Sequence, residues 1–280
     1  MRNFLLMILL TNLVGFVNSQ DITQTVSSLS SHRDADTISI RLNVIYPENG
    51  YIIPHYDLVG VENGTPTELN RVRVGETNYR VFDVHSKRNG ERINNLFILY
   101  GTNNAALERH LIMDANNYSR RGFWIFNNTM WNNVRRFSVH EQLSFYDPIC
   151  INDILFLHDL SNTLYNYRLL REEMYNGKNC YVIEFIDNTS RFTSPFYRML
   201  MWIGKDDNVI YKNSYFTRTN SLIKTYEIIE SNSIEGRILP KSYKITFPNG
   251  DYIVVQTQII RFNEPIPDRV FTPQYLETGR

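Results

Sequence analysis

The chain has 280 residues, with 29 Lys or Arg and 29 Asp or Glu, so its formal net charge at pH 7 is zero. A zero net charge argues against partners that are recognised by bulk charge, such as nucleic acids and anionic membrane surfaces. Two cysteines exclude a fold built on a disulfide framework, and the length suits one large all-β domain with a sizeable core.

The N-terminus has the features of a secretory signal peptide. A short basic segment precedes an apolar run over residues 4–17, and small residues follow that suit a signal peptidase. The run is too short to span a bilayer comfortably, although an uncleaved membrane anchor is the alternative interpretation. We therefore expect a signal peptide over residues 1–19, cleaved between Ser19 and Gln20, and a single soluble domain over residues 20–280.

Period-two alternation predicts that most of the remaining chain is β-strand. After a short predicted helix at residues 22–31, residues 37–46 form a strand with one apolar face made of Ile38, Ile40, Leu42, Val44 and Tyr46. Further strands are expected at residues 79–85, 95–100, 109–113, 122–126, 181–186, 199–203, 209–215, 222–229, 242–247 and 252–260. The turn-forming segments 205–208 and 248–251 each predict an antiparallel hairpin.

Two segments depart from this alternation. Residues 148–160 are rich in Ile and Leu and predict one or two short helices, with Asn152 or Asp153 as the N-cap. The C-terminal segment after residue 261 carries three prolines and predicts an extended tail. Because so few helices are available, the expected fold is mainly β, a curved antiparallel sheet capped by short helices that leaves apolar space for a lipid.

The chain contains no recognisable catalytic or metal-binding motif. Its six histidines are isolated, and His140-Glu141 resembles a zinc-protease helix only until Ser144, which stands where the second His would be. His158-Asp159 has no serine in a Gly-x-Ser-x-Gly turn to activate. We therefore expect no enzymatic activity and no cofactor.

Aromatic residues crowd the central segment of the chain. Ordinary core packing is one interpretation, since aromatic rings dominate β cores. The more specific hypothesis is that four rings line an apolar ligand cavity: Trp124, Phe126, Trp131 and Trp202. Basic pairs at residues 120–121 and 135–136 flank this segment, either as a solvated strand edge or as a contact for an acidic partner or a lipid head group.

The pairing of the two cysteines is not decided by the sequence. A disulfide between Cys150 and Cys180 is compatible with an oxidising compartment, and two buried free thiols are equally compatible.

Six segments, in this order, resemble successive signatures of LolA-like outer-membrane lipoprotein-sorting proteins. They are residues 120–137, 151–162, 176–185, 199–216, 234–245 and 261–277. The resemblance covers about residues 119–277, and the motifs are structural, so no binding residue is carried over. It implies a LolA/LolB-like fold, an unclosed half-barrel whose concave apolar face is covered by helices.

The resemblance also implies a function in the bacterial periplasm. LolA-like proteins hold the acyl chains of a lipoprotein between an inner-membrane transporter that loads them and an outer-membrane acceptor. We therefore expect a periplasmic carrier or binding protein for lipoprotein acyl chains or lipids. The alternative is a periplasmic sensor or adaptor on the same fold that binds a membrane protein.

Overall fold

The computed structural model describes residues 24–26, 37–45, 51–52, 72–73, 79–90, 92–101, 105–114, 122–128, 132–137, 165–188 and 196–279. Its strands are β1 (Thr37–Ile45), β2 (Tyr51–Ile52), β3 (Val72–Arg73), β4 (Tyr79–Asn89), β5 (Arg92–Tyr100), β6 (Ala106–Met113), β7 (Gly122–Asn127), β8 (Val134–Phe137), β9 (Tyr165–Tyr175), β10 (Lys178–Asp187), β11 (Arg198–Gly204), β12 (Ile210–Phe216), β13 (Leu222–Ile234), β14 (Arg237–Thr246) and β15 (Tyr252–Phe262). A 3₁₀ helix, η6 (Asp268–Phe271), and an α-helix, α3 (Pro273–Thr278), complete the chain, and residues 24–26 are helical. The predicted signal peptide and the predicted helix at 148–160 lie outside the described residues.

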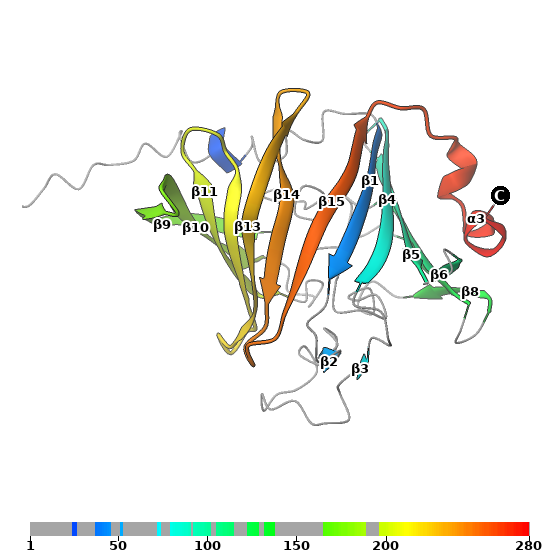
Figure 1. The fold of residues 1–280 in the computed structure, drawn as a ribbon, viewed down its shortest axis with the longest axis horizontal. Coiled ribbons are helices and arrows are strands. Elements are labelled where there is room, and N and C mark those ends of the chain that lie inside the picture. Colours follow the sequence, from blue (N-terminus) through cyan, green and yellow to red (C-terminus); the bar gives the residue numbers. More distant parts are fainter. Residues whose placement is uncertain are drawn as a thin grey trace, which may run out of the picture.

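Thirteen strands form one antiparallel sheet in the order β8-β7-β6-β5-β4-β1-β15-β14-β13-β12-β11-β10-β9. Every neighbouring pair is consecutive among the sheet's strands except β1 with β15, which joins the N-terminal and C-terminal halves of the sheet. Strands β8 and β9 end the sheet on opposite sides of the molecule and do not pair, so the sheet is curved but not closed (Figure 1). The predicted unclosed antiparallel sheet is confirmed.

The two faces of the sheet differ because side chains alternate along each strand. On β1, the predicted apolar residues Ile38, Ile40, Leu42 and Val44 are buried in the main hydrophobic cluster. The C-terminal tail lies against the other face of β4–β7, on the side away from β9–β13 (Figure 1). We call the face with the main cluster the inner face and the opposite face the outer face.

Both predicted hairpins are present. Gly204 and Val209 close the turn between β11 and β12, and Phe247 and Asp251 close the turn between β14 and β15. In the second turn Gly250 has a φ of +89°, a conformation that a β-carbon would strain. These turns connect consecutive antiparallel strands, so the C-terminal half of the sheet is a meander.

The C-terminal tail is extended only as far as Pro267, so the expectation of a wholly extended tail is wrong from Asp268 onward. Thr272 caps helix α3 by accepting a hydrogen bond from Tyr275 N, and Pro273 occupies the first helical turn, where its missing N–H costs nothing. Gly279 ends the helix in the left-handed conformation. The tail crosses the outer face instead of adding a strand to the sheet edge.

Edge strand β9 is attached to its neighbours by a buried carboxylate. Glu184 on β10 is 3 % exposed and accepts hydrogen bonds from Arg168 of β9 at 2.5 Å and from Arg198 of β11 at 2.6 Å. Burial alone would raise the pKa of Glu184, but the two guanidinium donors outweigh it and lower the pKa below its ordinary value of 4.5. The triad joins three strands on the outer face.

This triad predicts an acid-sensitive contribution to stability. Because the folded-state pKa of Glu184 is lowered, its contribution is present above about pH 4.5 and is lost as the pH falls through the folded-state pKa. We expect Glu184→Gln to lower the free energy of unfolding by about 2 kcal/mol at pH 7, and to flatten its decline at acidic pH. Urea unfolding of both proteins between neutral and acidic pH measures this, and parallel pH profiles would contradict it.

Candidate functional site

The inner face carries one continuous apolar cluster that draws residues from strands across the whole sheet. Its members include Phe123 of β7 at one side and Phe185 of β10 at the other, and Val26 of the N-terminal helical turn packs with them. The outer face instead carries two smaller clusters, one over β5–β7 beneath the tail and one over β10–β14. The inner face is therefore the largest apolar surface that the fold organises.

A register row across five strands shows how this face is built. Residues that lie directly opposite one another share a face of the sheet. The row consists of Met201, Asn213, Tyr226, Ile245 and Ile253, contributed by β11 to β15 in order. Each of the five side chains is at most 1 % exposed. The side chains of this row are therefore shielded from water in the structure.

Polar side chains interrupt the inner face at few places. His110 and Glu108 form a buried pair with 2.6 Å between Nε2 and Oε1, and the His110 ring packs edge-on against Phe123. Lys224 is fully buried, with its Nζ 5.2 Å from the centre of the Phe196 ring and 5.3 Å from that of Tyr215. Asn213 is also fully buried. These groups place a small number of polar side chains on an otherwise apolar face.

The aromatic residues that the sequence suggested as cavity lining lie on the outer face where they are described. Trp124 and Phe126 belong to the cluster beneath the tail, and Trp202 belongs to the cluster over β10–β14. Trp131 lies outside the described residues. Their strand neighbours Phe123, Ile125, Met201 and Ile203 point to the inner face instead. A lining role for the three described rings stays a prediction.

Trp124 and Trp202 each pack against charged side chains, but the neighbours of the two rings differ. Gly122 leaves room for the Trp124 ring, because a β-carbon there would overlap it, and the Arg136 guanidinium lies 5.4 Å from the ring centre. Trp202 donates a hydrogen bond from Nε1 to Glu173, which lowers the pKa of that carboxyl, and Lys212 lies 5.1 Å from its ring centre. Each ring is thus packed against charged partners.

Cys180 is a free, buried thiol in the outer-face cluster around Trp202, and Cys150 lies outside the described residues. Burial, with Asp207 and Glu173 nearby, raises the pKa of Cys180 to about 11. Because the thiolate is the reactive form, we expect Cys180 to resist iodoacetamide at pH 8 in the native protein and to react in denaturant. Peptide mass spectrometry reads out this site, and native alkylation at the rate of the denatured control would contradict the prediction.

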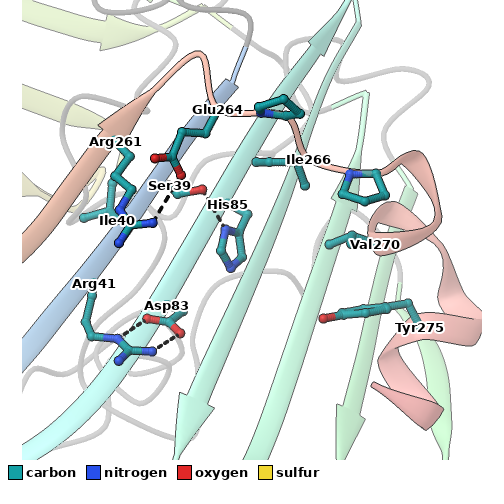
Figure 2. A pocket seen from close by; sticks show the side chains of 12 residues that line it. Ser39, Ile40, Arg41, Asp83, His85, Arg261, Glu264, Ile266, Val270 and Tyr275 are labelled. Atoms are coloured by element: carbon teal, nitrogen blue, oxygen red, sulfur yellow. Dashed lines mark hydrogen bonds and ion pairs between the residues drawn. The ribbon is translucent and has the colours of Figure 1, made fainter. Parts of the chain in front are cut away.

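A separate pocket lies on the outer face, between the sheet and the C-terminal tail. Its volume is about 430 Å³, and Figure 2 shows side chains of β1 and β4 on one side and those of the tail on the other. Its lining includes Ser39, Arg41, Asp83, His85, Arg261, Glu264, Ile266, Val270 and Tyr275. The strand side of the pocket is polar, whereas the tail side is largely apolar.

Charged groups in this pocket are already paired with one another. Arg41 donates two hydrogen bonds to Asp83, at 2.7 and 2.6 Å, and Tyr100 donates a third at 3.0 Å. The hydrogen bond and the charge of Asp83 raise the pKa of Arg41, while burial and Asp83 raise that of Tyr100 to about 12. This pocket therefore offers no excess charge to select a charged ligand.

The His85 ring occupies the centre of the pocket (Figure 2). Its Nδ1 lies 3.0 Å from Ser39 Oγ, and burial lowers its pKa below 6.5. His85 is therefore uncharged at neutral pH, and its neutral ring offers one N–H donor and one acceptor nitrogen.

Three side chains of the sheet hold the tail over the pocket. Thr37 Oγ1 donates to Glu264 O at 2.6 Å, and Lys87 Nζ donates to Ile266 O at 2.7 Å and pairs with Asp268 at 2.7 Å. Arg109 Nη1 donates to Leu276 O at 2.6 Å. These contacts hold the tail on the outer face at each end of the pocket.

In the described part of the chain, no group of three or more His, Cys, Asp or Glu side chains is arranged to hold a metal ion. Among the helices that the structure describes, none is both long enough and apolar enough to cross a membrane.

Comparisons with known proteins agree on the fold. The solved structure of a DUF1329 family protein from Desulfovibrio piger is similar with a TM-score of 0.70 and 16 % identity, over 90 % of this chain and 96 % of that one. A structure described as an outer membrane lipoprotein-sorting protein domain, from Vibrio parahaemolyticus, is similar with a TM-score of 0.67 and 14 % identity, over 91 % and 99 % of the two chains. A LolA superfamily protein from Nitrosomonas europaea has a TM-score of 0.60 and 15 % identity, over 91 % and 98 %.

Comparison with curated protein sequences finds no match. A family model described as "-like: Uncharacterized protein" matches residues 108–278, which is more than half of the chain. The match begins in β6 and includes the tail, the same region that carries the LolA-like signatures. The chain therefore belongs to the family that this model describes, and it has the fold of LolA-like lipoprotein-sorting proteins.

Proposed function

We propose that the protein is a periplasmic carrier or binding protein for the acyl chains of lipids or lipoproteins, and that it acts by burial of these chains and not by catalysis. The observation that carries the proposal is the inner-face cluster, which is apolar and continuous across an unclosed sheet. The structure from Vibrio parahaemolyticus, which is described as a lipoprotein-sorting protein domain and has the same fold, supports the same role.

Elementary energetics explain why such a protein is needed. Each CH₂ group transferred from water to an apolar environment is stabilised by about 0.8 kcal/mol, so a long acyl chain does not cross an aqueous compartment unaided. An apolar face can replace the membrane during the crossing. Because the sheet is unclosed, its two edges are not tied by a strand ladder, which favours opening for uptake and release.

Location and partners follow from the same proposal. The signal-like N-terminus supports export, and a carrier between two membranes requires an inner-membrane component that loads it and an outer-membrane acceptor that unloads it. The inner-face residues of β10 to β13 are the proposed contacts for the acyl chains, since they form a contiguous part of the cluster that includes Ile183, Met201 and Tyr226.

Native mass spectrometry with lipid extraction tests the proposal on mature protein purified from the periplasm of its own host. The expected result is discrete additions of lipid or lipopeptide mass, and transfer of the same lipid to acceptor vesicles. A clean ligand-free mass together with no transfer would overturn the carrier proposal and favour a sensor or adaptor on the same fold.

A further inference from the structure

One polar residue, Asn213, lies in the middle of an otherwise apolar row of the inner face. Asn213 is flanked in register by Met201 on β11 and Tyr226 on β13, and Ile245 and Ile253 continue the row. All four neighbours belong to the inner-face cluster, and the Asn213 side chain is 0 % exposed.

The side-chain amide of Asn213 has no hydrogen-bond partner. Both Oδ1 and Nδ2 are buried without one, and among the described residues no other side chain leaves both an acceptor and a donor of one amide unpaired. Buried amide groups are almost always hydrogen-bonded, because burial of an unpaired one is unfavourable. The unpaired amide of Asn213 is therefore a destabilising group on the proposed binding face.

A bound water molecule is a poor explanation for this group. A buried water needs two to four polar partners, and of the two residues directly opposite Asn213, Met201 offers only a thioether and Tyr226 only a single hydroxyl. An unpaired amide is also a poor match for a bare hydrocarbon chain, which has neither donors nor acceptors. The amide instead suits a ligand that carries both.

We infer that Asn213 binds the polar linkage at the root of the acyl chains, an ester or amide carbonyl together with a neighbouring O–H or N–H. The carbonyl accepts from Nδ2, and the O–H or N–H donates to Oδ1. This inference rests on the proposed function and adds the chemical class of the cargo. An ester-linked glycerolipid and an acylated lipoprotein N-terminus share this chemistry.

The test compares three probes on the full mature protein and its variants. Monooleoylglycerol carries an ester and hydroxyl groups, a synthetic diacylglyceryl-cysteine lipopeptide carries esters and an amide, and diphenylhexatriene is a pure hydrocarbon. Asn213→Leu removes both hydrogen-bonding atoms at similar volume. Met201→Leu is the matched control, since it changes the adjacent position of the same row without changing polarity.

Asn213→Leu is expected to weaken binding of one or both polar probes by about tenfold or more and to leave diphenylhexatriene binding unchanged or tighter. Met201→Leu should not change the ratio between polar and apolar probes. Loss confined to monooleoylglycerol assigns the linkage to a free glycerolipid, and loss confined to the lipopeptide assigns it to a lipoprotein.

Thermal unfolding without ligand supplies a second, opposite readout. Because the leucine removes an unpaired buried amide, ligand-free Asn213→Leu should melt about 2–4 °C higher than the wild type. Asn213→Ala, which adds no volume, should also bind the polar probes more weakly relative to diphenylhexatriene.

Three outcomes are distinguishable. Equal affinity of wild type and both Asn213 variants for the polar probes would overturn the inference and leave the carrier proposal standing. A lower melting temperature for both Asn213 variants would also overturn it, because Asn213 would then have a structural partner. Failure of the wild type to bind any of the three probes would overturn the proposed function itself.

Discussion

Deletion of residues 265–280 is expected to cause a large loss of stability. The tail contributes Phe271 and Leu276, 3 % and 0 % exposed, to the cluster over β5–β7. Loss of a side chain at such sites costs about 2–5 kcal/mol each, so the deletion should lower the free energy of unfolding by about 5 kcal/mol or more. Globular domains are stable by only about 5–15 kcal/mol, so the shortened protein should be marginally folded.

Thermal and urea unfolding measure this effect. Leu276→Ala should reproduce part of it, about 3 kcal/mol, and Glu277→Ala, an exposed neighbour, should have little effect. Unchanged unfolding of the shortened protein would mean that the tail does not stabilise the sheet.

Two adjacent residues on β11 should separate ligand binding from stability. Met201 points to the inner face and Trp202 to the outer face. We expect Met201→Gln, which keeps the length of the side chain, to reduce lipid binding at least about tenfold, because it places a polar amide against the acyl chains. Trp202→Gln should lower stability by about 3 kcal/mol through lost packing and leave lipid binding of the folded fraction unchanged.

The comparison requires lipid titration of the folded fraction beside urea unfolding of both variants. The sequence-based hypothesis, in which Trp202 lines the cavity, predicts the opposite result. Stronger loss of lipid binding in Trp202→Gln than in Met201→Gln would therefore move the ligand to the outer face.

Strand positions were predictable because alternation and turn residues are local signals. The predicted strand over 37–46 matches β1 closely, since a half-buried strand between two neighbours needs one apolar face. The period-two pattern does not reveal strand β9, because Arg171, Glu172 and Glu173 are three consecutive charged residues. The Asn176-Gly177 turn, with both φ values positive, is a hairpin signal that could have revealed it.

The helical end of the tail also had a signal in the sequence. Thr272-Pro273 is a typical helix start and Gly279 a typical helix end, but three prolines suggested extended chain. The helix is short, so these caps and its packing on β6 and β7 decide its formation more than intrinsic propensity does.

The face on which each aromatic ring lies was not predictable from the sequence. On β7, Phe123 and Ile125 point inward while Trp124 and Phe126 point outward, and both pairs are apolar because the tail covers the outer face there. Where both faces of a strand are covered, alternation no longer distinguishes them. The sequence also does not predict the unpaired amide of Asn213, because its lack of a partner depends on which residues the strand register places opposite it.

Photo-crosslinking tests the central claim, acyl-chain binding at the inner face, most directly. A lipid with a photoreactive group near the end of its acyl chain is bound to the mature protein, irradiated, and the labelled residues are identified by peptide mass spectrometry. We predict labels on inner-face residues such as Ile183, Met201 and Tyr226. Labels confined to the outer-face clusters around Trp124 and Trp202 would contradict the proposal.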